Sequence, residues 1–379
     1  MSNHIKEVYL DHSATTPVDL EVLEAMYPFF AQNFGNASSV HQIGRATRIE
    51  IDKSREQIAK LINAFPDEIY FVSGGTEADN IAIKGIVYAN IAKGDHIITS
   101  AAEHDAVLNT CRALEKQGVE VSYLPVDEFG QVSPKEIRSH IKGTTILISI
   151  IHCNNEVGTI NPIEDIGQIA KEADIYFHSD AVQSFGKIPI DVLTSNLSLM
   201  SISGHKIYGP KGIGALYMRS GTKIDSLIHG GHQEKSLRPG TENNPCIVGL
   251  SKAATLMYER MENDYQKVGG LRDYFQGKLL NQFNNVKING HPSNRLYNNL
   301  NVSFLGIDSE TMLLKLDRFG IAASNGSACN SGSISPSHVL RAMGLSDAEM
   351  QSAIRFSLGR QNTKEEIDYV LDSLKQILS

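Results

Sequence analysis

Four short segments of this sequence hold residue types that could do covalent chemistry. They are Ser73-Gly74-Gly75-Thr76-Glu77, Ile175–Asp180, Ser201–Lys206 and Ser324–Ser337, which contains Cys329. A glycine-rich turn can bind an anion, an acid can pair with a cationic ring, and a lysine or a cysteine can act as a nucleophile. The segments lie far apart along the chain, so the fold must bring them together for them to form one site.

The glycine-rich segment separates a predicted strand, Ile69–Ser73, from a predicted helix, Thr76–Asn90. Two glycines let the backbone approach a ligand closely, and the first turn of a helix offers free N–H groups and a favourable dipole to an anion. Because the Thr76 hydroxyl adds another polar group, the segment fits a phosphate. The alternative is a plain glycine turn in which Thr76 is the N-cap of the helix.

Asp180 and Lys206 each follow a run of residues typical of a buried strand. A carboxylate at such a place needs a cationic partner, such as a protonated ring nitrogen, because an unpaired buried charge is costly. A lysine in an apolar crevice has its ammonium form disfavoured, which suits Schiff-base chemistry. Each residue also has an ordinary interpretation, Asp180 as a cap of the next segment and Lys206 as a surface lysine in a glycine-rich loop.

Cys329 lies among small polar residues, with almost nothing to pack against it. An exposed thiol on such a loop can move, and its reactivity depends on thiolate formation. A tolerated surface cysteine is the alternative. Since cysteine is more often a buried small hydrophobe, Cys111, Cys153 and Cys246 are interpreted as structural. No two cysteines form a C-x-x-C pair, so neither a zinc knuckle nor a disulfide framework is expected, and no metal site is predicted.

The middle of the sequence alternates strand-like runs with helical patterns. This predicts an α/β fold in which a mostly parallel, seven-stranded sheet carries helices on both faces. In such sheets ligands gather at the carboxyl ends of the strands, where three of the four segments lie. The predicted strands are Ile69–Ser73, His96–Ser100, Val119–Pro125, Thr145–Ile151, Ile175–Asp180 and Leu197–Ser203, and the predicted helices are Thr76–Asn90, Ala106–Gln117 and Ile163–Ala173.

The pattern changes beyond residue 260, and a second, smaller α+β domain is expected there. We expect the large domain to span residues 15–260, and the small domain to combine residues 1–14 with residues 261–379 and to carry the Cys329 loop. The predicted elements of the small domain are helices at Tyr258–Phe283, Ser309–Phe319 and Lys364–Leu378, and strands at Asn298–Phe304 and Ser352–Leu358.

Composition narrows the classes of function. A net charge of −8 over 379 residues argues against a general nucleic-acid binder, which needs a concentrated basic face. No apolar run approaches the roughly 18 residues of a membrane span, and the first residues lack the apolar stretch of a signal peptide. The expected location is therefore the cytoplasm, where the cysteines would be free thiols.

A phosphate cup, a crevice carboxylate and a crevice lysine at the strand ends of one sheet are together what a pyridoxal-phosphate site needs. The sequence also resembles the class V aminotransferase-like family of fold-type I pyridoxal-phosphate enzymes, and within it the cysteine desulfurases of the NifS/IscS type. The shared motifs are Tyr9–Pro17, Phe34–Ser39, Ser73–Glu77, Glu103-His104, His152–Glu156, Asp180–Gln183, Ser203–Lys206, Arg238–Asn243, Ser324–Ser335 and Ile354–Gly359.

The resemblance implies a role for each of these motifs around pyridoxal 5'-phosphate. Lys206 would hold the cofactor covalently, Asp180 would pair with the ring nitrogen, His104 would stack on the ring, and Gln183 would bond the phenolic oxygen. Asn155 and Arg355 would orient the substrate, with Arg355 clamping its carboxylate, a bidentate task that suits a planar guanidinium. The phosphate would be bound by Gly75, Thr76, Ser203 and His205, and by Thr241 from the neighbouring subunit of a homodimer.

The implied reaction converts L-cysteine to L-alanine. Lys206 would move the Cα proton, His104 would act as acid or base at the substrate thiol, and Cys329 would take the sulfur as a persulfide. The sulfur would then pass to an acceptor protein, such as an iron–sulfur scaffold or a tRNA-thiolation protein.

Other reactions on the same fold are alternatives, namely selenocysteine lyase, kynureninase-like and aminotransferase activity. An aminotransferase needs no mobile cysteine, so the Cys329 segment argues against that activity. A selenocysteine lyase could use the same residues. A non-catalytic scaffold that has kept the fold is a further alternative, and the joint presence of Lys206, Asp180, His104 and Cys329 argues against it.

Overall fold

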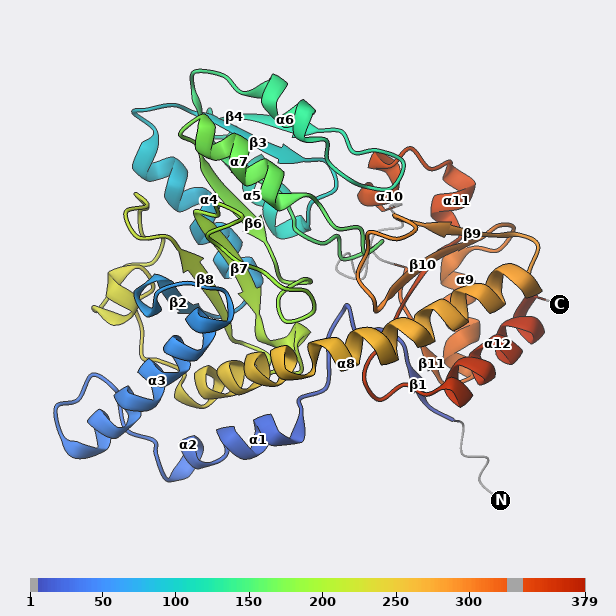
Figure 1. Ribbon diagram of the computed structural model, residues 1–379, viewed down its shortest axis with the longest axis horizontal. Coiled ribbons are helices and arrows are strands. Elements are labelled where there is room, and N and C mark those ends of the chain that lie inside the picture. Colours follow the sequence, from blue (N-terminus) through green and yellow to red (C-terminus); the bar gives the residue numbers. More distant parts are fainter. Residues whose placement is uncertain (1–5, 326–336, 379) are drawn as a thin grey trace.

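The computed structural model describes residues 6–325 and 337–378. Figure 1 shows a large sheet in one half of the molecule and smaller sheets in the other, with the long helix α8 (Asn244–Gln282) running along both halves. Cys329 and its neighbours in 326–336 lie outside the described residues. Within the described residues, no helix is both long and apolar enough to cross a membrane.

The large sheet has seven strands in the order β2-β8-β7-β6-β5-β3-β4. All pairs from β7 to β4 are parallel, whereas β8 is antiparallel to both of its neighbours. The predicted mostly parallel, seven-stranded sheet is thus confirmed. Its strands are β2 (Ile69–Val72), β3 (His96–Ser100), β4 (Glu120–Leu124), β5 (Thr145–Ser149), β6 (Tyr176–Asp180), β7 (Leu199–Ser203) and β8 (Gly214–Met218).

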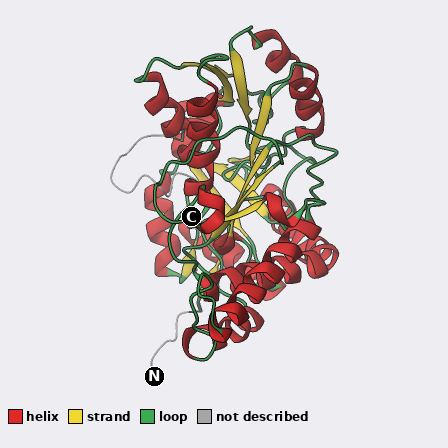
Figure 2. Cartoon of the chain, turned by 90° about the vertical axis from the view of Figure 1, so that its left-hand side faces the viewer, coloured by secondary structure: helices red, strands yellow, loops and turns green. Residues whose placement is uncertain are grey.

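Helices cover both faces of this sheet, and Figure 2 shows the strands between them. Successive strand residues point to opposite faces, so neighbours such as Leu147 and Ile148 pack into different buried clusters. One cluster includes α4 and α5, and the other includes α3, α7 and α8. The helices are α3 (Gln42–Leu61), α4 (Gly75–Asn90), α5 (Asp105–Glu115), α6 (Pro134–His140) and α7 (Ile163–Glu172).

The second half of the molecule has its own apolar core, which includes Phe275, Phe304 and Phe356. An antiparallel sheet of order β12-β10-β9 forms its centre, and β1 pairs with β11 beside it. The strands are β1 (Val8–Tyr9), β9 (Val286–Asn289), β10 (Asn299–Phe304), β11 (Ile321–Ala322) and β12 (Ala353–Ser357), and the helices are α9 (Ser309–Arg318), α10 (His338–Ala342), α11 (Asp347–Gln351) and α12 (Lys364–Leu378).

The N-terminal residues join this second core through β1, because Val8 and Leu10 are buried in it. That placement agrees with the expected assignment of the first residues to the small domain. The expected limit at residue 260 falls inside α8, which continues without interruption from Asn244, and the domain limits therefore stay a prediction.

The helix predicted to begin at Tyr258 begins 14 positions earlier, at Asn244, and this expectation was wrong at its N-terminal end. Pro245 occupies the first turn, where its missing N–H costs nothing. The sequence pattern also did not predict β8 and α3, or the short helices α1 (Leu20–Met26) and α2 (Pro28–Ala31).

Candidate active site

One pocket of about 310 Å³ lies at the carboxyl ends of the central strands. It is lined by every predicted cofactor and substrate residue except Thr241, while Cys329 lies outside the described residues. The predicted residues that line it are Gly75, Thr76, His104, Asn155, Asp180, Gln183, Ser203, His205, Lys206 and Arg355. Residues that are up to 280 positions apart in the sequence therefore meet in one pocket.

The glycine-rich segment forms the expected cup at the start of α4. The first N–H groups of a helix have no partner within it, so those of Gly75 and Thr76 are available to an anion. Ser203, at the end of β7, has its hydroxyl oxygen 3.9 Å from where a Cβ of Gly74 would stand. Burial lowers the pKa of His205 to about 4, which keeps its ring neutral near pH 7. This arrangement fits a phosphate.

Lys206 enters the pocket from the short turn that follows β7. Its amine donates hydrogen bonds to the backbone carbonyls of Ser13 and Ala14, at 2.6 and 2.7 Å. The N-terminal segment is held there because Thr16 donates from both its N–H and its hydroxyl to the carbonyl of His205. The N-terminal segment at residues 13–16 and the turn after β7 thus fix the position of the lysine together.

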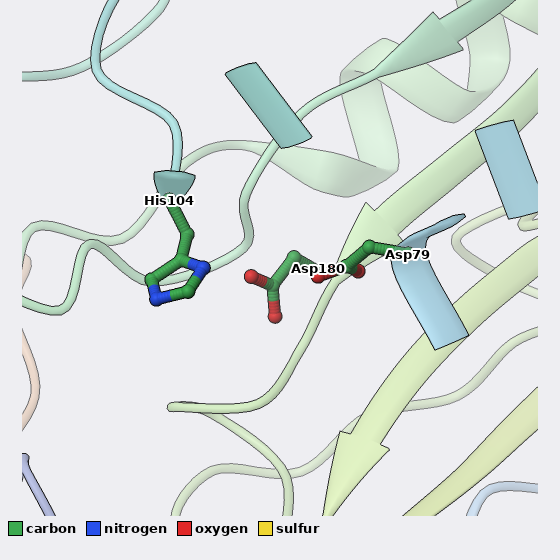
Figure 3. Close-up of side chains that lie close together, drawn as sticks. All are labelled: Asp79, His104 and Asp180. Carbon is green, nitrogen blue, oxygen red and sulfur yellow. The ribbon is translucent and has the colours of Figure 1, made fainter. Parts of the chain in front are cut away.

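Asp180 lies at the end of β6, with His104 on one side and Asp79 on the other (Figure 3). The three side chains each offer an atom that lies within 4.8 Å of the others. His104 caps α5, its Nδ1 accepting from the N–H of Ala106. Burial raises the pKa of both acids, and the two carboxyls also repel each other, so the pair carries a proton more readily than isolated acids do.

Asp79 lies beside a buried hydrogen-bonded network of His178, Ser149 and Ser201. His178 lies within hydrogen-bond distance of Ser149 Oγ through Nδ1, at 2.9 Å, and of Ser201 Oγ through Nε2, at 3.0 Å. The same Nε2 lies 3.6 Å from an Asp79 oxygen. Burial lowers the pKa of His178 to about 3, so the ring is neutral and cannot neutralise Asp79 as a cation. A proton on Asp79, whose pKa is raised by burial, would remove its charge.

Gln183 and the pair Asn155 and Arg355 complete the walls. The Gln183 amide donates from Nε2 to the Ser13 carbonyl at 2.9 Å. Arg355 donates from Nη1 to the Asn155 carbonyl at 3.0 Å and from Nη2 to Asp11 at 2.8 Å. Its Nε and the Asn155 side-chain oxygen are buried and have no partner among the described residues. Buried polar atoms are normally paired, so these two indicate a place for a polar ligand.

Thr241 does not line this pocket. It is exposed in a neighbouring depression, together with Arg238 and Gly240. Its predicted role was a contact to the cofactor of the neighbouring subunit, which no contact within a single chain can test. That role stays a prediction.

The three described cysteines have the structural character that was expected. Cys111 and Cys153 are buried, and Cys246 is half-buried. Burial raises the pKa of each thiol, to about 12 for Cys111, so thiolates are disfavoured at all three positions. None of them fits the part of a nucleophile.

The polar residues of the pocket could hold either a metal ion or an organic cofactor with a phosphate. Asp79, His104 and Asp180 could together hold a metal ion. A metal explains neither the cup at Gly75 nor the lysine held at the other side of the pocket. A cofactor with a phosphate, a ring nitrogen and a carbonyl carbon uses all of these features, and the unpaired Arg355 Nε and Asn155 oxygen leave polar atoms for a substrate.

Among the lining residues that were not predicted from the sequence, Asp79, Ser13 and Ala14 contribute polar groups. Asp79 lies three positions after Thr76 on α4, so the two share a helix face, and an acid within the apolar run of that helix was the available signal. The carbonyls of Ser13 and Ala14 act through backbone atoms, which have no signature in residue type.

Comparisons with known proteins agree with one another. The sequence profile of the family described as Aminotransferase class-V matches residues 8–370. A protein named "Cysteine desulfurase IscS" from Methanosarcina thermophila is 53% identical over 378 residues, which is 100% of this chain and 93% of that protein. A solved structure described as a NifS-like protein superposes with a TM-score of 0.93 at 39% identity, covering 98% of this chain and 99% of the other. Another, described as SspA in complex with cysteine, has a TM-score of 0.81 at 41% identity, covering 92% and 98%.

Proposed function

The chain belongs to the aminotransferase class-V family, and from this premise we propose that it is a pyridoxal-phosphate-dependent cysteine desulfurase with the PLP fold of type I. The observation that carries the proposal is the convergence of Lys206, Asp180 and the glycine cup on one pocket. The relative named cysteine desulfurase matches along the whole chain, so the similarity includes every segment that contributes to this pocket.

The residues that would hold the cofactor are those of the pocket. Gly75, Thr76, Ser203 and His205 would bind the phosphate, Asp180 would keep a proton on the ring nitrogen, and Lys206 would hold the carbonyl carbon. His104 would stack on the ring, and Gln183 would donate to the phenolic oxygen. When bound, pyridoxal phosphate supplies an electron sink for a negative charge that develops at the substrate Cα.

The remaining pocket residues would bind and orient L-cysteine. Arg355 is 2% exposed, and among the described residues neither its Nε nor the side-chain oxygen of Asn155 has a hydrogen-bond partner. The guanidinium would donate from Nε to the substrate carboxylate. Lys206 would then move the proton at Cα, and His104 would carry a proton at the substrate thiol. The SspA structure, solved with cysteine, supports cysteine as the substrate.

Cys329 would receive the sulfur. The described ends of its segment flank the pocket, because Ser324 pairs with the backbone of Arg355 and the Ser337 hydroxyl donates to Glu156, next to Asn155. In the reaction the Cys329 thiolate forms a bond to the substrate sulfur while the Cβ–S bond breaks. Cβ takes up a proton, and the products are alanine and a persulfide on Cys329, so atoms and electrons balance without an added oxidant.

A homodimer is part of the proposal, and an exposed apolar surface supports it. Leu20, Tyr27 and Phe30 on α1 and α2 are 74, 71 and 63% exposed, and Phe34 and Val40 follow at 63 and 87%. Single exposed apolar residues are common, but these five, all within residues 20–40, favour an interaction site. The segment of Thr241 lies near Phe34 of this group, because Asn244 donates to the backbone carbonyl of Gly35 at 3.1 Å.

The dimer can be tested by sedimentation of the wild type and of Phe30→Asp. We expect a dimer for the wild type, and for the variant a monomer that also binds pyridoxal phosphate more weakly, since Thr241 would be withdrawn from the partner's site. A wild-type monomer with full cofactor affinity would contradict the dimer.

The persulfide sulfur would pass to an acceptor protein, such as an iron–sulfur scaffold or a tRNA-thiolation protein. A cytoplasmic location is also proposed, and the unpaired state of the three described cysteines supports it, since free thiols persist in reducing compartments.

The activity is tested by measuring alanine released from L-cysteine in the presence of a thiol reductant. We expect Lys206→Ala and Cys329→Ser to lower the rate at least 100-fold, and Cys246→Ser, a matched change at a cysteine outside the pocket, to leave it unchanged. Selenocysteine is the second arm of the assay. If Cys329→Ser turns over L-cysteine at the wild-type rate, the assignment as a desulfurase fails.

A further inference from the structure

Lys187 is a buried lysine to which the proposed reaction assigns no part. It lies in the turn at 182–187 that follows β6, and it is 4% exposed. Lysines are almost never buried without a paired charge. Within residues 6–325 and 337–378, no carboxylate lies within ion-pair distance of its amine. Because burial of an unpaired ammonium costs free energy, stability does not explain why a lysine stands at this position.

The contacts of Lys187 lead directly to the pocket. Its amine donates to the Gln183 backbone carbonyl at 2.9 Å and to the Gln183 side-chain oxygen Oε1 at 3.2 Å. The same side-chain amide donates from Nε2 to the Ser13 carbonyl at 2.9 Å. That carbonyl also accepts from the Lys206 amine at 2.6 Å. A continuous chain of hydrogen bonds therefore joins Lys187, Gln183, Ser13 and Lys206.

The contact at Oε1 fixes which way the Gln183 amide faces. An amide can present either its oxygen or its nitrogen to a ligand, and the two ends differ only in hydrogen-bonding sense. Because an ammonium can only donate, Lys187 requires the oxygen on its own side and turns Nε2 toward Ser13 and the pocket. The proposed contact of Gln183 to the cofactor needs this donor.

The Lys187 and Lys206 side chains also share a second, much smaller cavity. This cavity of about 10 Å³ lies outside the main pocket and is lined by both lysines together with His12. Lys187 does not line the main pocket, so it lies beyond Lys206 as seen from the cofactor site. It cannot touch the substrate or the cofactor from there, and any effect it has on the reaction must act through its neighbours.

We propose that Lys187 is a positioning residue of this site, whose amine orients the Gln183 amide toward the cofactor and places a buried positive charge behind the Lys206 amine. The inference rests on the proposed function, since it concerns the contact of Gln183 and Lys206 to pyridoxal phosphate.

The electrostatics of the region agree with this role. Burial, together with repulsion from Lys206, lowers the pKa of Lys187 to about 7. The repulsion is mutual, so a charged Lys187 disfavours a positive charge on the nitrogen of Lys206. Several other titratable and charged groups of the described residues act on Lys187 or share its cavity. They are Arg355 on β12, Cys153 after β5, His12 of the N-terminal segment, His205 and Tyr208 on either side of Lys206, Asp264 on α8, Tyr297 before β10 and Arg360 after β12.

A purely structural role is the simpler explanation, since the bond from the amine to the Gln183 backbone carbonyl closes the turn. That role predicts an effect on stability alone. The proposed role predicts two further effects, on cofactor affinity through Gln183 and on the pH at which the nitrogen of Lys206 titrates.

The experiment uses the full chain and two readouts other than activity. The first is the dissociation constant for pyridoxal phosphate in a double-mutant cycle of Lys187→Met and Gln183→Ala. The second is the midpoint of the pH titration of the visible band of the bound cofactor. Lys187→Gln, which keeps a polar group but not the charge, serves if the methionine variant does not fold, and Lys116→Met, at an exposed lysine outside the pocket, is the matched control.

We expect Lys187→Met to weaken cofactor binding about 5-fold in the wild-type background, the equivalent of one hydrogen bond, and less than 2-fold when Gln183 is already alanine. Since removal of a nearby positive charge favours the protonated form, we expect the midpoint to rise by ~0.5–1 pH unit in both the Met and the Gln variant. Lys116→Met should change neither readout.

Either an additive cycle or a midpoint within about 0.2 unit of the wild type overturns the proposal. A failure of the proposed function would look different. In that case the wild type itself would show no visible band that disappears in Lys206→Ala, whatever the Lys187 variants do.

Discussion

A Gly75→Ala substitution tests whether the close approach of α4 to the turn after β6 forms the phosphate cup. A Cβ built at residue 75 would meet Val182 Cγ2 at 2.6 Å and Ser203 Cβ at 3.8 Å. Since carbon atoms in contact lie about 3.5–4.0 Å apart, the first turn of α4 and Val182 would have to separate by about 1 Å. Val182 is β-branched and stiff, so its side chain cannot simply rotate away.

The expected cost of this overpacking is about 1–3 kcal/mol in the free energy of unfolding. The shift also moves the N–H groups of residues 75 and 76 away from the phosphate, and we expect cofactor affinity to fall about 10-fold. Unfolding in urea measures the first effect, and titration of the cofactor-free protein with pyridoxal phosphate measures the second.

The double variant Gly75→Ala/Val182→Ala is the matched control, because it removes the methyl group that the new Cβ would meet. We expect it to recover most of the lost affinity, whereas Val182→Ala alone should cost only about 1 kcal/mol of stability. The reasoning is refuted if Gly75→Ala binds the cofactor as tightly as the wild type, or if the double variant binds no better than Gly75→Ala.

Three further substitutions test other parts of the account. Asp79→Asn should keep cofactor affinity within about 3-fold, because burial favours a protonated Asp79. Asp180→Asn should weaken cofactor affinity at least about 10-fold. An equal loss in both variants would contradict a protonated Asp79. Burial raises the pKa of Glu103 in the folded protein to about 8. The stabilisation from its protonated carboxyl is therefore complete below the pKa that Glu103 has in the unfolded chain, and it is lost as the pH rises toward 8. Over this range the free energy of unfolding of the wild type should fall relative to that of Glu103→Gln, by at most about 1.4 kcal/mol per pH unit, and parallel curves for the two proteins would disprove this. Ser337→Ala removes both the cap of α10 and the hydrogen bond to buried Glu156, and should cost about 1–3 kcal/mol in urea unfolding, with an unchanged midpoint as the contrary result.

The parts of the fold that could be predicted are those in which side-chain pattern alone determines the element. Strands β3 and β6 are short segments that contain β-branched or aromatic residues and end in the polar residues Ser100 and Asp180, and they lie where the pattern indicated. Their carboxyl ends meet because parallel strands of one sheet end at the same edge, so the pocket residues at strand ends were also predictable.

The missed elements are those whose position depends on the tertiary structure. β8 follows a glycine-rich turn and itself begins with Gly214 and Ala215, which are weak strand formers. It is a strand because it fills the space between β2 and β7. α3 carries many charged residues and buries only a narrow stripe that includes Ile51 and Ile58, against the sheet and α8. Such a helix has a weak apolar signal.

The missed parts of the site have a similar cause. The Ser13 carbonyl contacts Lys206 only because the N-terminal segment passes along the turn that follows β7, and a backbone atom has no signal in the sequence. Asp79 and Lys187 are charged residue types that are usually exposed, and their burial is visible only in three dimensions.

The central claim is that Lys206 is the residue that holds pyridoxal phosphate, at the point where the glycine cup and Asp180 meet. Reduction of the cofactor-loaded protein with borohydride makes the bond to lysine permanent, and peptide mass spectrometry then identifies the modified residue. The account predicts the modification on Lys206 alone. Modification of Lys187 or of a surface lysine, or no modification at all in a protein that has bound the cofactor, would contradict it.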